Sequence, residues 1–293
     1  MSCAIEELTY TNERGESLAF SVASPFYVNF KNVSGLSDIR NIVYSINSMG
    51  QDGDTLVGNR IESRDIEVVG HIKAIEKERK HFLQRQISRI LNPHYDAKLV
   101  YKRGDYTRVI DCKVENAPVF SRNEVFVHFT IQLVCLNPFW REETETREDI
   151  ALWVGAFEFP LEIPVTGIEM GYRQPSLIVN VPNNGDVRAG MRIEFRALGA
   201  VENPSLLNIN TGEFIRFNMT LIAGDALTVS TAYGQKRATL TRGGVDADAF
   251  KHIDVDSDYL QLEVGDNLFR YDADTNLGNL EVSIYHNNYY LGV

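Results

Sequence analysis

The chain has 293 residues, of which 44% are hydrophobic and 24% charged, values that are ordinary for a soluble globular protein. This length accommodates two domains of usual size. The N-terminal sequence lacks the basic and apolar segments of a secretory signal, and no run approaches the ~18 apolar residues that span a bilayer. We therefore expect synthesis in a cytoplasm and no membrane insertion.

The net charge of −11 lies entirely in the second half of the chain. Residues 1–140 contain 17 Lys and Arg against 17 Asp and Glu, whereas residues 141–293 contain 12 against 23. This asymmetry indicates two units with different surroundings. It also argues against sequence-specific nucleic-acid binding, because contacts with phosphates need clustered Lys and Arg.

The first part of the chain predicts antiparallel strands separated by turns. Residues 5–20 alternate apolar and polar side chains about a central turn, which is typical of a hairpin. Residues 26–46 contain two further strand candidates around Gly35, and residues 61–70 contain another. Residues 47–60 are rich in glycine and poor in apolar anchors, so they predict a long mobile loop.

Residues 72–91 are the strongest helix candidate. Apolar residues recur there at helical spacing on one stripe, and Lys and Arg occupy much of the remaining surface. Asn92 and Pro93 end the segment, because proline cannot continue a helix and disfavours helical geometry in the residue before it. We expect this helix to lie across a sheet. The apolar stripe comprises Ile72, Ile75, Phe82, Leu83, Ile87, Ile90 and Leu91.

A second hairpin and a long strand follow the helix. Residues 98–103 and 106–114 predict the hairpin. Residues 123–136 give the clearest strand pattern in the chain, because every other residue from Val125 to Cys135 is apolar. One face of this strand should meet a core and the other should meet water.

A charged run marks the expected domain boundary. Residues 141–149 have no apolar periodicity, so the sequence predicts a domain at 1–140, an acidic linker at 141–150 and a domain at 151–293. The second domain shows regularly spaced glycine turns between short alternating runs, which indicates a β-sandwich or barrel. The expected fold class is mostly β, with one main α-helix.

The sequence contains no motif of a hydrolase, a zinc protease or a nucleotide-binding loop. The histidines are scattered without metal-ligand spacing, and the acidic clusters at Asp254 and Asp272 lack the glycine and glutamate of an EF-hand loop. We expect no catalytic residues, no metal and no cofactor. Two alternatives stay open: a calcium site built from loops, and catalytic carboxylates far apart in sequence.

Cysteines and aromatic residues give two further expectations. The cysteines show neither paired nor metal-ligand spacing, so buried free thiols in a reducing compartment are expected at Cys3, Cys112 and Cys135. Aromatic side chains of the second domain are candidates for stacking on sugar rings, with packing in the core or at a strand edge as the competing interpretation. These candidates are Trp153, Tyr285, Tyr289 and Tyr290.

Segments in both halves follow one characteristic order. The loop Gly50–Gly53, with sequence GQDG, precedes Arg60 and an arginine-led strand at 64–70, and a long apolar strand ends in CLNPFW at 135–140. Strands and turns of the second half continue the series at 175–179, 209–215, 221–229 and 262–267. The series resembles the distal tail protein family of long-tailed phages over nearly the whole chain. Val264 departs from it, because many relatives carry proline before the turn glycine.

The resemblance implies that the first domain, a β-sandwich with a helix and a hairpin, forms a hexameric ring that continues the tail tube. The second domain would be a galectin-like or carbohydrate-module-like β-sandwich that projects outward. The protein would be a structural component of the virion tail tip or baseplate, made in the host cytoplasm, and not an enzyme. Implied partners are five further copies, the tail tube protein, the tail-associated hub protein, and receptor-binding proteins or a host surface polysaccharide. The alternative function is a carbohydrate-binding adhesion module on the virion.

The same reasoning predicts where neighbouring subunits meet. An antiparallel domain exposes strand edges that a closed ring can cover. The flexible loop could wrap a neighbour and become ordered on assembly. The residues expected at this subunit interface are Gly50, Gln51, Asp52, Gly53, Arg60 and Arg64.

Overall fold

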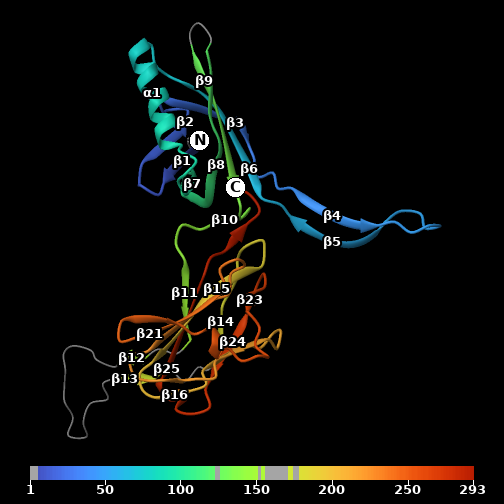
Figure 1. The fold of residues 1–293 in the computed structure, drawn as a ribbon, viewed down its shortest axis with the longest axis vertical. Coiled ribbons are helices and arrows are strands. Elements are labelled where there is room, and N and C mark those ends of the chain that lie inside the picture. The colour runs from blue at the N-terminus through green and yellow to red at the C-terminus, as the bar shows by residue number, and fades with distance from the viewer. Residues whose placement is uncertain (1–5, 123–125, 151–152, 156–170, 174–177) are drawn as a thin grey trace. The chain divides into compact units, whose positions relative to one another are not determined.

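The computed structural model describes residues 6–122, 126–150, 153–155, 171–173 and 178–293 (Figure 1). The chain divides into two compact units, unit 1 (Met1–Glu143 with Tyr289–Val293) and unit 2 (Thr144–Asn288). Strands dominate both, which confirms the mostly β fold expected from the sequence. Within the described residues, no helix has the length and apolar character needed to cross a membrane.

Unit 1 consists of strands and the helix α1 (Lys77–Ile90). Its strands are β1 (Glu6–Asn12), β2 (Ser17–Ser21), β3 (Phe26–Ser34), β4 (Asn41–Ile46), β5 (Thr55–Ile61), β6 (Arg64–Ile72), β7 (Ala97–Arg103), β8 (Tyr106–Arg122), β9 (Val127–Cys135), β10 (Trp140–Arg141) and β26 (Tyr289–Tyr290). The second hairpin predicted from the sequence corresponds to β7 and β8, which pair in antiparallel register.

The main sheet of unit 1 closes on itself. Its strands follow the order β8-β7-β1-β2-β3-β6-β9, and β9 pairs back onto β8. Residues 106–112 of β8 pair with β7 and residues 113–122 pair with β9, whose register shifts between Val114 and Asn116 and again between Asn116 and Val119. Such irregularities bend a strand and increase its twist. Each strand of the circuit therefore has a neighbour on both sides along part of its length, and β2 and β3 meet only at Phe20↔Phe26 and Ser21↔Tyr27.

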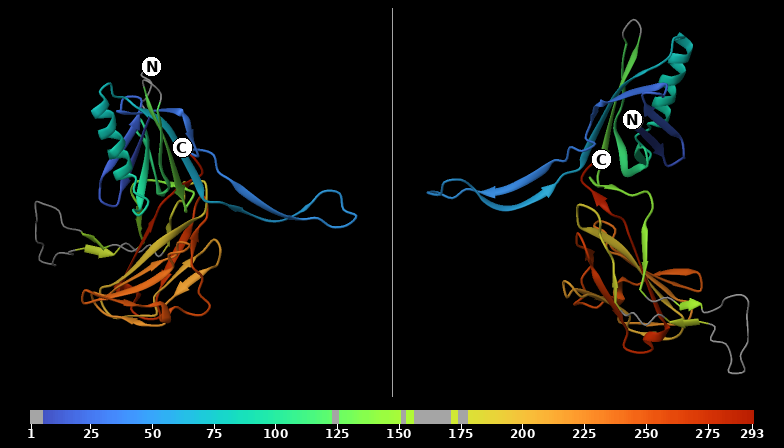
Figure 2. Two further views of the ribbon diagram at one scale, coloured as in Figure 1. Left: turned by 45° about the horizontal axis from the view of Figure 1, so that its top comes forward. Right: turned by 180° about the vertical axis from the view of Figure 1, so that it is seen from behind.

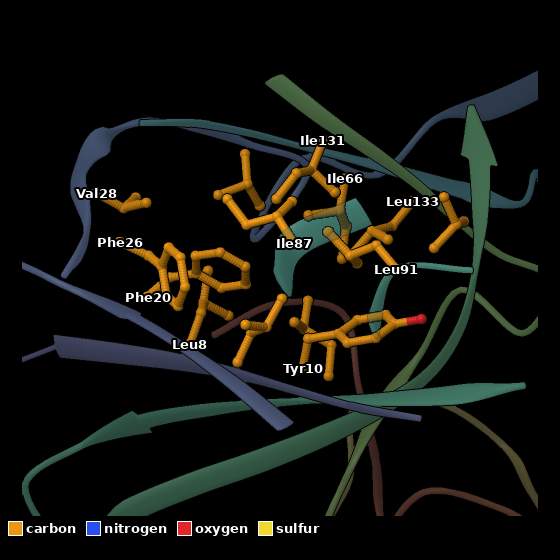
Figure 3. Close-up of a cluster of buried hydrophobic side chains, with 14 of the residues drawn as sticks. Leu8, Tyr10, Phe20, Phe26, Val28, Ile66, Ile87, Leu91, Ile131 and Leu133 are labelled. Carbon is orange, nitrogen blue, oxygen red and sulfur yellow. The ribbon is translucent and has the colours of Figure 1, made fainter. Parts of the chain in front are cut away.

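The alternating pattern of β9 fills the interior of this circuit. Val127, Phe129, Ile131, Leu133 and Cys135 are all buried, as the sequence predicted. The rings of Phe129 and Phe20 lie 5.9 Å apart between centroids. Figure 3 shows side chains of several strands converging with two from the helical segment, and each fully buried one contributes about 1.5–3 kcal/mol. Those labelled are Leu8, Tyr10, Phe20, Phe26, Val28, Ile66, Ile87, Leu91, Ile131 and Leu133.

The helix begins later than the apolar stripe predicted. Ile72 is the last residue of β6, where it pairs with Val127 and is buried, so the strand rather than the helix takes it. Ile75 and Phe82 belong to the predicted stripe but are exposed. The helix contacts β2, β6 and β8. Its buried side chains are Leu83, Ile87 and Ile90.

Unit 2 is built from short strands and two 3-10 turns. Its strands are β11 (Thr146–Asp149), β12 (Trp153–Gly155), β13 (Gly171–Arg173), β14 (Ile178–Asn180), β15 (Ala189–Ala197), β16 (Val201–Glu202), β17 (Ser205–Asn208), β18 (Phe214–Arg216), β19 (Thr220–Leu221), β20 (Ala226–Ser230), β21 (Arg237–Arg242), β22 (Val245–Asp248), β23 (Gln261–Leu262), β24 (Leu268–Asp272) and β25 (Leu280–His286). The turns are η1 (Phe250–His252) and η2 (Leu277–Asn279).

Two main sheets supply the core of unit 2. One has the order β11-β25-β15-β20-β21-β22, with β23 also on β15, and the other has the order β14-β24-β17-β18. Ile193 and Phe195 of the first sheet are buried, as are Leu206 and Phe269 of the second. The Phe195 ring lies 6.1 Å from the ring of Phe217, which follows β18. Inward side chains therefore alternate along the strands, as turn-separated runs in the sequence indicated.

The charged stretch 141–150 is not an unstructured connection throughout. Residues 146–149 form β11, which pairs with β25 from Thr146↔His286 to Asp149↔Ser283. The guanidinium of Arg147 lies 2.8 Å from the Asp149 carboxylate, so charges within the run compensate each other. The sequence pattern did not predict this strand, because its side chains are polar on both faces and show no apolar alternation.

Candidate interaction site

The segment predicted as a long loop is half of a hairpin. Strands β4 and β5 pair in antiparallel register from Asn41↔Ile61 to Ile46↔Thr55, which leaves residues 47–54 as the tip. The prediction of an unpaired segment was therefore wrong for residues 55–60. Gly50 and Gly53 have φ values of 84° and 78°, in the left-handed region that glycine adopts without steric cost.

The hairpin presents apolar side chains to solvent. Within the described chain, β4 and β5 pair only with each other, and the hairpin extends away from the closed sheet of unit 1 (Figures 1 and 2). Leu56 is 65% exposed and Val57 60%. An isolated two-stranded hairpin is marginally stable in water, and clustered apolar exposure marks contact surfaces. The exposed apolar residues of the hairpin are Val43, Tyr44, Ile46, Met49, Leu56 and Val57.

Arg64 fixes the base of the hairpin from inside unit 1. Its side chain is buried, with the residue only 2% exposed, and burial lowers the pKa of its guanidinium. The Nε atom donates to the Pro138 carbonyl at 2.7 Å, and Nη1 donates to the Gly35 carbonyl at 2.7 Å. Arg64 therefore joins segments that are far apart in sequence. Its remaining acceptors are the carbonyl oxygens of Leu36, Asp38 and Leu291.

The turn before β4 is held by a second set of contacts. Trp140 is buried and donates its indole N–H to the Leu36 carbonyl at 2.9 Å. Gly35 has a φ of 82°, and a Cβ placed there would lie 2.0 Å from the Asp65 carbonyl oxygen. At the point where the hairpin leaves the sheet, Arg40 pairs with Glu62 at 3.1 Å. The hairpin thus projects from a rigid base.

The predicted interface residues fall into two groups. The residues from Gly50 to Gly53 are exposed at the tip of the hairpin, and Arg60 is exposed on β5. Arg64 does not join them, because its guanidinium is buried and engaged with backbone carbonyls. Its assignment to a subunit contact is corrected to an internal structural role. A lone arginine heading a strand gives no sequence signal that distinguishes these roles.

Sequence reasoning did not identify the exposed apolar residues on the strands of the hairpin. Val43, Ile46, Leu56 and Val57 lie in two short runs, IVYSI and TLV, on either side of a glycine-containing segment. Two such runs separated by turn residues are a hairpin signal. The glycines of residues 47–60 favoured a loop, and the two apolar runs are too short to outweigh that pattern.

The four aromatic candidates for sugar contact do not all belong to one unit. Trp153 starts β12 and Tyr285 lies on β25 in unit 2, whereas Tyr289 and Tyr290 form β26 in unit 1. The side chain of Trp153 lies outside the described residues. The Tyr285 ring has the Arg192 guanidinium carbon 3.8 Å from its centroid, so an internal partner already occupies that position.

Tyr290 is committed to the packing of unit 1. Its hydroxyl donates to a Glu142 carboxylate oxygen at 2.7 Å, and the Arg108 guanidinium carbon lies 3.9 Å from its ring centroid. Burial, followed by the Glu142 contact, raises the pKa of Tyr290 to about 12. The ring centroid of its neighbour Tyr289 lies 6.2 Å from that of Phe139. These contacts favour the packing interpretation for both tyrosines.

The described residues contain no group of three or more His, Cys, Asp or Glu side chains able to hold a metal ion. In the acidic segments, Asp254 accepts from the Asn218 amide at 2.9 Å, and Asp274 pairs with Arg216 at 2.7 Å. The hydrogen bond from Asn218 lowers the pKa of the Asp254 carboxyl, and a hydrogen bond from Asn203, followed by the charge of Arg216, lowers that of Asp274. The carboxylates are therefore used in loop structure.

The two described thiols are inert by environment. Cys112 and Cys135 are free and buried, as the sequence predicted, and Cys3 lies outside the described residues. Burial raises the pKa of the Cys135 thiol to about 12 and that of Cys112 well above its usual value. A nucleophile needs the opposite shift, because the thiolate is the reactive form.

Two family models match the chain, one in each half. Residues 17–135 match the phage tail protein RIFT-related domain. Residues 184–290 match the C-terminal domain of the siphovirus-type tail component. A search of proteins with curated function returned no match.

Solved structures show the same fold over nearly the whole length. The crystal structure of the SPP1 Dit protein, described as a paradigm of the hub adsorption apparatus in phages that infect Gram-positive bacteria, is 14% identical with a TM-score of 0.68. The alignment covers 96% of this chain and 98% of that chain. A chain of the phage p2 baseplate in its activated conformation with Sr is 12% identical with a TM-score of 0.53, and the alignment covers 96% of this chain and 97% of that chain. A chain of the same baseplate in its activated conformation with Ca is 13% identical with a TM-score of 0.53, and the alignment covers 97% of this chain and 98% of that chain.

Proposed function

Because this chain belongs to the distal tail protein family of siphophages, and is a hub component of the tail or baseplate of the virion, we propose that six copies form a ring. In this proposal unit 1 builds the ring, which connects the tail tube protein to the tail-associated hub protein. Unit 2 projects outward and anchors receptor-binding or host-adhesion components. The role is structural rather than enzymatic.

The observation that carries the ring proposal is the exposed apolar hairpin β4–β5. A hairpin with apolar side chains on its surface gains stability when a second surface covers it. Each residue such as Leu56 or Val57 contributes on the order of 1 kcal/mol or more when its exposed area is removed from water. In a ring, each subunit can cover one neighbour and be covered by the other, so the contact closes without an end.

The closed sheet limits which strand edges are left to form a contact between subunits. The sequence suggested that exposed strand edges would be covered by ring symmetry. In the structure β9 pairs with β8, so the main sheet closes into a circuit, in which β2 and β3 pair only at Phe20↔Phe26 and Ser21↔Tyr27. Within the described residues β4 and β5 pair only with each other, so a neighbouring strand can join their outer edges. We therefore place the contact on the hairpin, with Gly50 to Gly53 at its tip and Arg60 along β5.

The test replaces apolar side chains without touching the base of the hairpin. A triple variant, Ile46→Ser/Leu56→Ser/Val57→Ser, removes exposed side chains from both strands. A second variant deletes residues 49–57. The matched control is Ile222→Ser/Val245→Ser/Val255→Ser, which changes three exposed apolar residues of unit 2. Sedimentation velocity of the full chain measures the fraction assembled at each protein concentration.

We expect the control to assemble like the unchanged chain and both hairpin variants to sediment as monomers. Circular dichroism checks that the variants keep their strand content. If the triple variant and the deletion both assemble at unchanged concentration, the hairpin is not the subunit contact. A ring could then still form through another surface, and the proposal of the hairpin contact alone would be lost.

A further inference from the structure

A second exposed surface of unit 1 combines positive charge with apolar side chains. We call it the α1 surface and define it by Ile75, Arg79, Phe82, Arg85, Arg89 and Phe126. Ile75 is 98% exposed, Phe82 58% and Phe126 45%. Large apolar residues this open are costly in water when they gather at one place. The ring proposal assigns no role to them.

The exposed face of α1 carries one phenylalanine with arginines on both sides of it in sequence. Phe82, Arg85 and Arg89 are spaced by three and four residues, and Arg79 precedes Phe82 by three, so all four lie on neighbouring positions of one face. The Arg79 guanidinium carbon lies 5.3 Å from the centroid of the Phe82 ring. Leu83, Ile87 and Ile90 form the buried face of the helix. Helix packing therefore holds the arginine and phenylalanine face toward solvent.

A recess of about 850 Å³ lies at the N-terminal end of this face. Ile75 and Phe126 contribute apolar surface to it, while Lys73, Arg79 and Lys80 contribute positive charge. The Phe126 ring is held 5.0 Å from the His71 ring between centroids, which fixes one wall. Ala74 and Glu76 complete the lining. The recess can therefore take an apolar side chain beside an acidic one.

We infer that the α1 surface docks an acidic segment of a partner protein, with an apolar side chain of that segment in the recess. Between residues 73 and 89 the chain carries six Lys and Arg residues against two glutamates, Glu76 and Glu78, and one of the six, Arg89, pairs with Glu16 at 3.1 Å. Such a surface is complementary to clustered Asp and Glu. Arginine and aromatic residues are enriched at the energetic centres of protein interfaces.

The exposed side chains favour a protein over a nucleic acid. A phosphate backbone gains from clustered cations, but it gains little from a fully exposed isoleucine such as Ile75. Two glutamates within the helical segment would also repel a continuous line of phosphates. An acidic protein segment can place its carboxylates beside Arg79 and Arg85 and direct only an apolar side chain into the recess, where Glu76 forms part of the lining.

The α1 surface is exposed in the single chain, as the open side chains of Ile75, Phe82 and Phe126 show. Strand β6 ends at Ile72, immediately before the recess. All its members belong to one subunit, so docking does not depend on ring formation.

The test uses the full chain and a fluorescent synthetic peptide with four Asp or Glu residues around a Leu and a Phe. Control probes are the same peptide with Asn and Gln in place of the acids, and a 20-base-pair DNA duplex. The docking variants are Arg79→Glu/Arg85→Glu and, separately, Phe82→Ser. The matched control, Lys31→Glu/Lys102→Glu, reverses two exposed lysines elsewhere in unit 1. Fluorescence anisotropy gives the affinity, and hydrogen exchange locates the protected amides.

We expect the acidic peptide to bind, to protect amides of α1, and to bind more weakly as salt increases. Each docking variant should weaken binding by roughly tenfold or more, while the lysine control leaves it unchanged. The inference is overturned if the acidic peptide does not bind, or if the docking variants bind it as well as the unchanged chain. Tighter binding of the DNA duplex, lost in Arg79→Glu/Arg85→Glu, would assign the surface to nucleic acid instead.

Discussion

The Nε atom of Arg64 donates to the carbonyl oxygen of Pro138 at 2.7 Å, across 74 positions of sequence. The same guanidinium reaches the turn at Gly35 and the C-terminal segment at Leu291. The buried guanidinium of Arg64 therefore joins the start of β6 to three other segments: the turn before the hairpin, the residues that follow β9, and the C-terminal segment.

Replacing Arg64 with methionine should destabilise unit 1 by about 3 kcal/mol, because several buried carbonyls lose their donor. Hydrogen exchange of β6 and β9 amides in the full chain measures the opening free energy of unit 1. The control is Arg60→Met, which changes an exposed arginine and should shift that energy by less than about 0.5 kcal/mol. Equal effects of the two substitutions would contradict the assigned role of Arg64.

Two glycines with similar backbone angles should respond differently to alanine. Gly35 has a φ of 82°, and its added Cβ would meet the Asp65 carbonyl oxygen, whereas Gly15 has a φ of 78° and no atom within 4 Å of its added Cβ. We expect Gly15→Ala to cost about 1 kcal/mol from backbone strain alone. Gly35→Ala should cost more, because the turn must also shift. Hydrogen exchange of β6 checks both, and equal costs would contradict the steric explanation.

The buried thiols should make unit 1 sensitive to alkali. Burial raises the pKa of Cys135 from 9.0 to about 12, so the unfolded chain releases this proton at lower pH than the folded chain. The stabilisation is fully present below pH 9 and is lost as the pH rises toward 12, by up to about 1.4 kcal/mol per pH unit for each thiol. Opening free energies at pH 8, 9 and 10 test this dependence. The variant Cys112→Ala/Cys135→Ala should show a shallower decline, and an unchanged decline would contradict the assignment.

The same environment predicts slow alkylation. Cys112 and Cys135 should resist iodoacetamide in the folded chain at pH 8 and react after unfolding, because little thiolate forms in the buried state. Peptide mapping by mass spectrometry reports each cysteine separately. Rapid labelling of either residue in the folded chain would show that its strand opens readily.

Parts of the fold were predictable because local pattern and tertiary structure agree. The alternation along 127–135 is the core pattern of β9, since one face of the strand meets the interior. The helix boundary failed at Ile72 because an apolar residue suits both periodicities, and pairing with Val127 decided for the strand. Strand β11 was missed because charge pairs replace apolar alternation there.

The sequence located the candidate interaction site but did not predict its secondary structure. The sequence predicted a contact loop at residues 47–60. It did not predict the hairpin, because the apolar runs that form its strands are short and their side chains are exposed. The role of Arg64 depends on carbonyl groups from residues 35 to 291, which only the folded chain brings together. The same holds for the α1 surface, where Phe82 fits the apolar stripe in sequence but faces solvent.

The most direct test of the ring is the native mass of the purified full chain, combined with negative-stain imaging. We expect a particle of six times 33.1 kDa with a central opening. A protein that stays monomeric across the accessible concentration range, with its hairpin intact by hydrogen exchange, would contradict a ring formed by this chain alone.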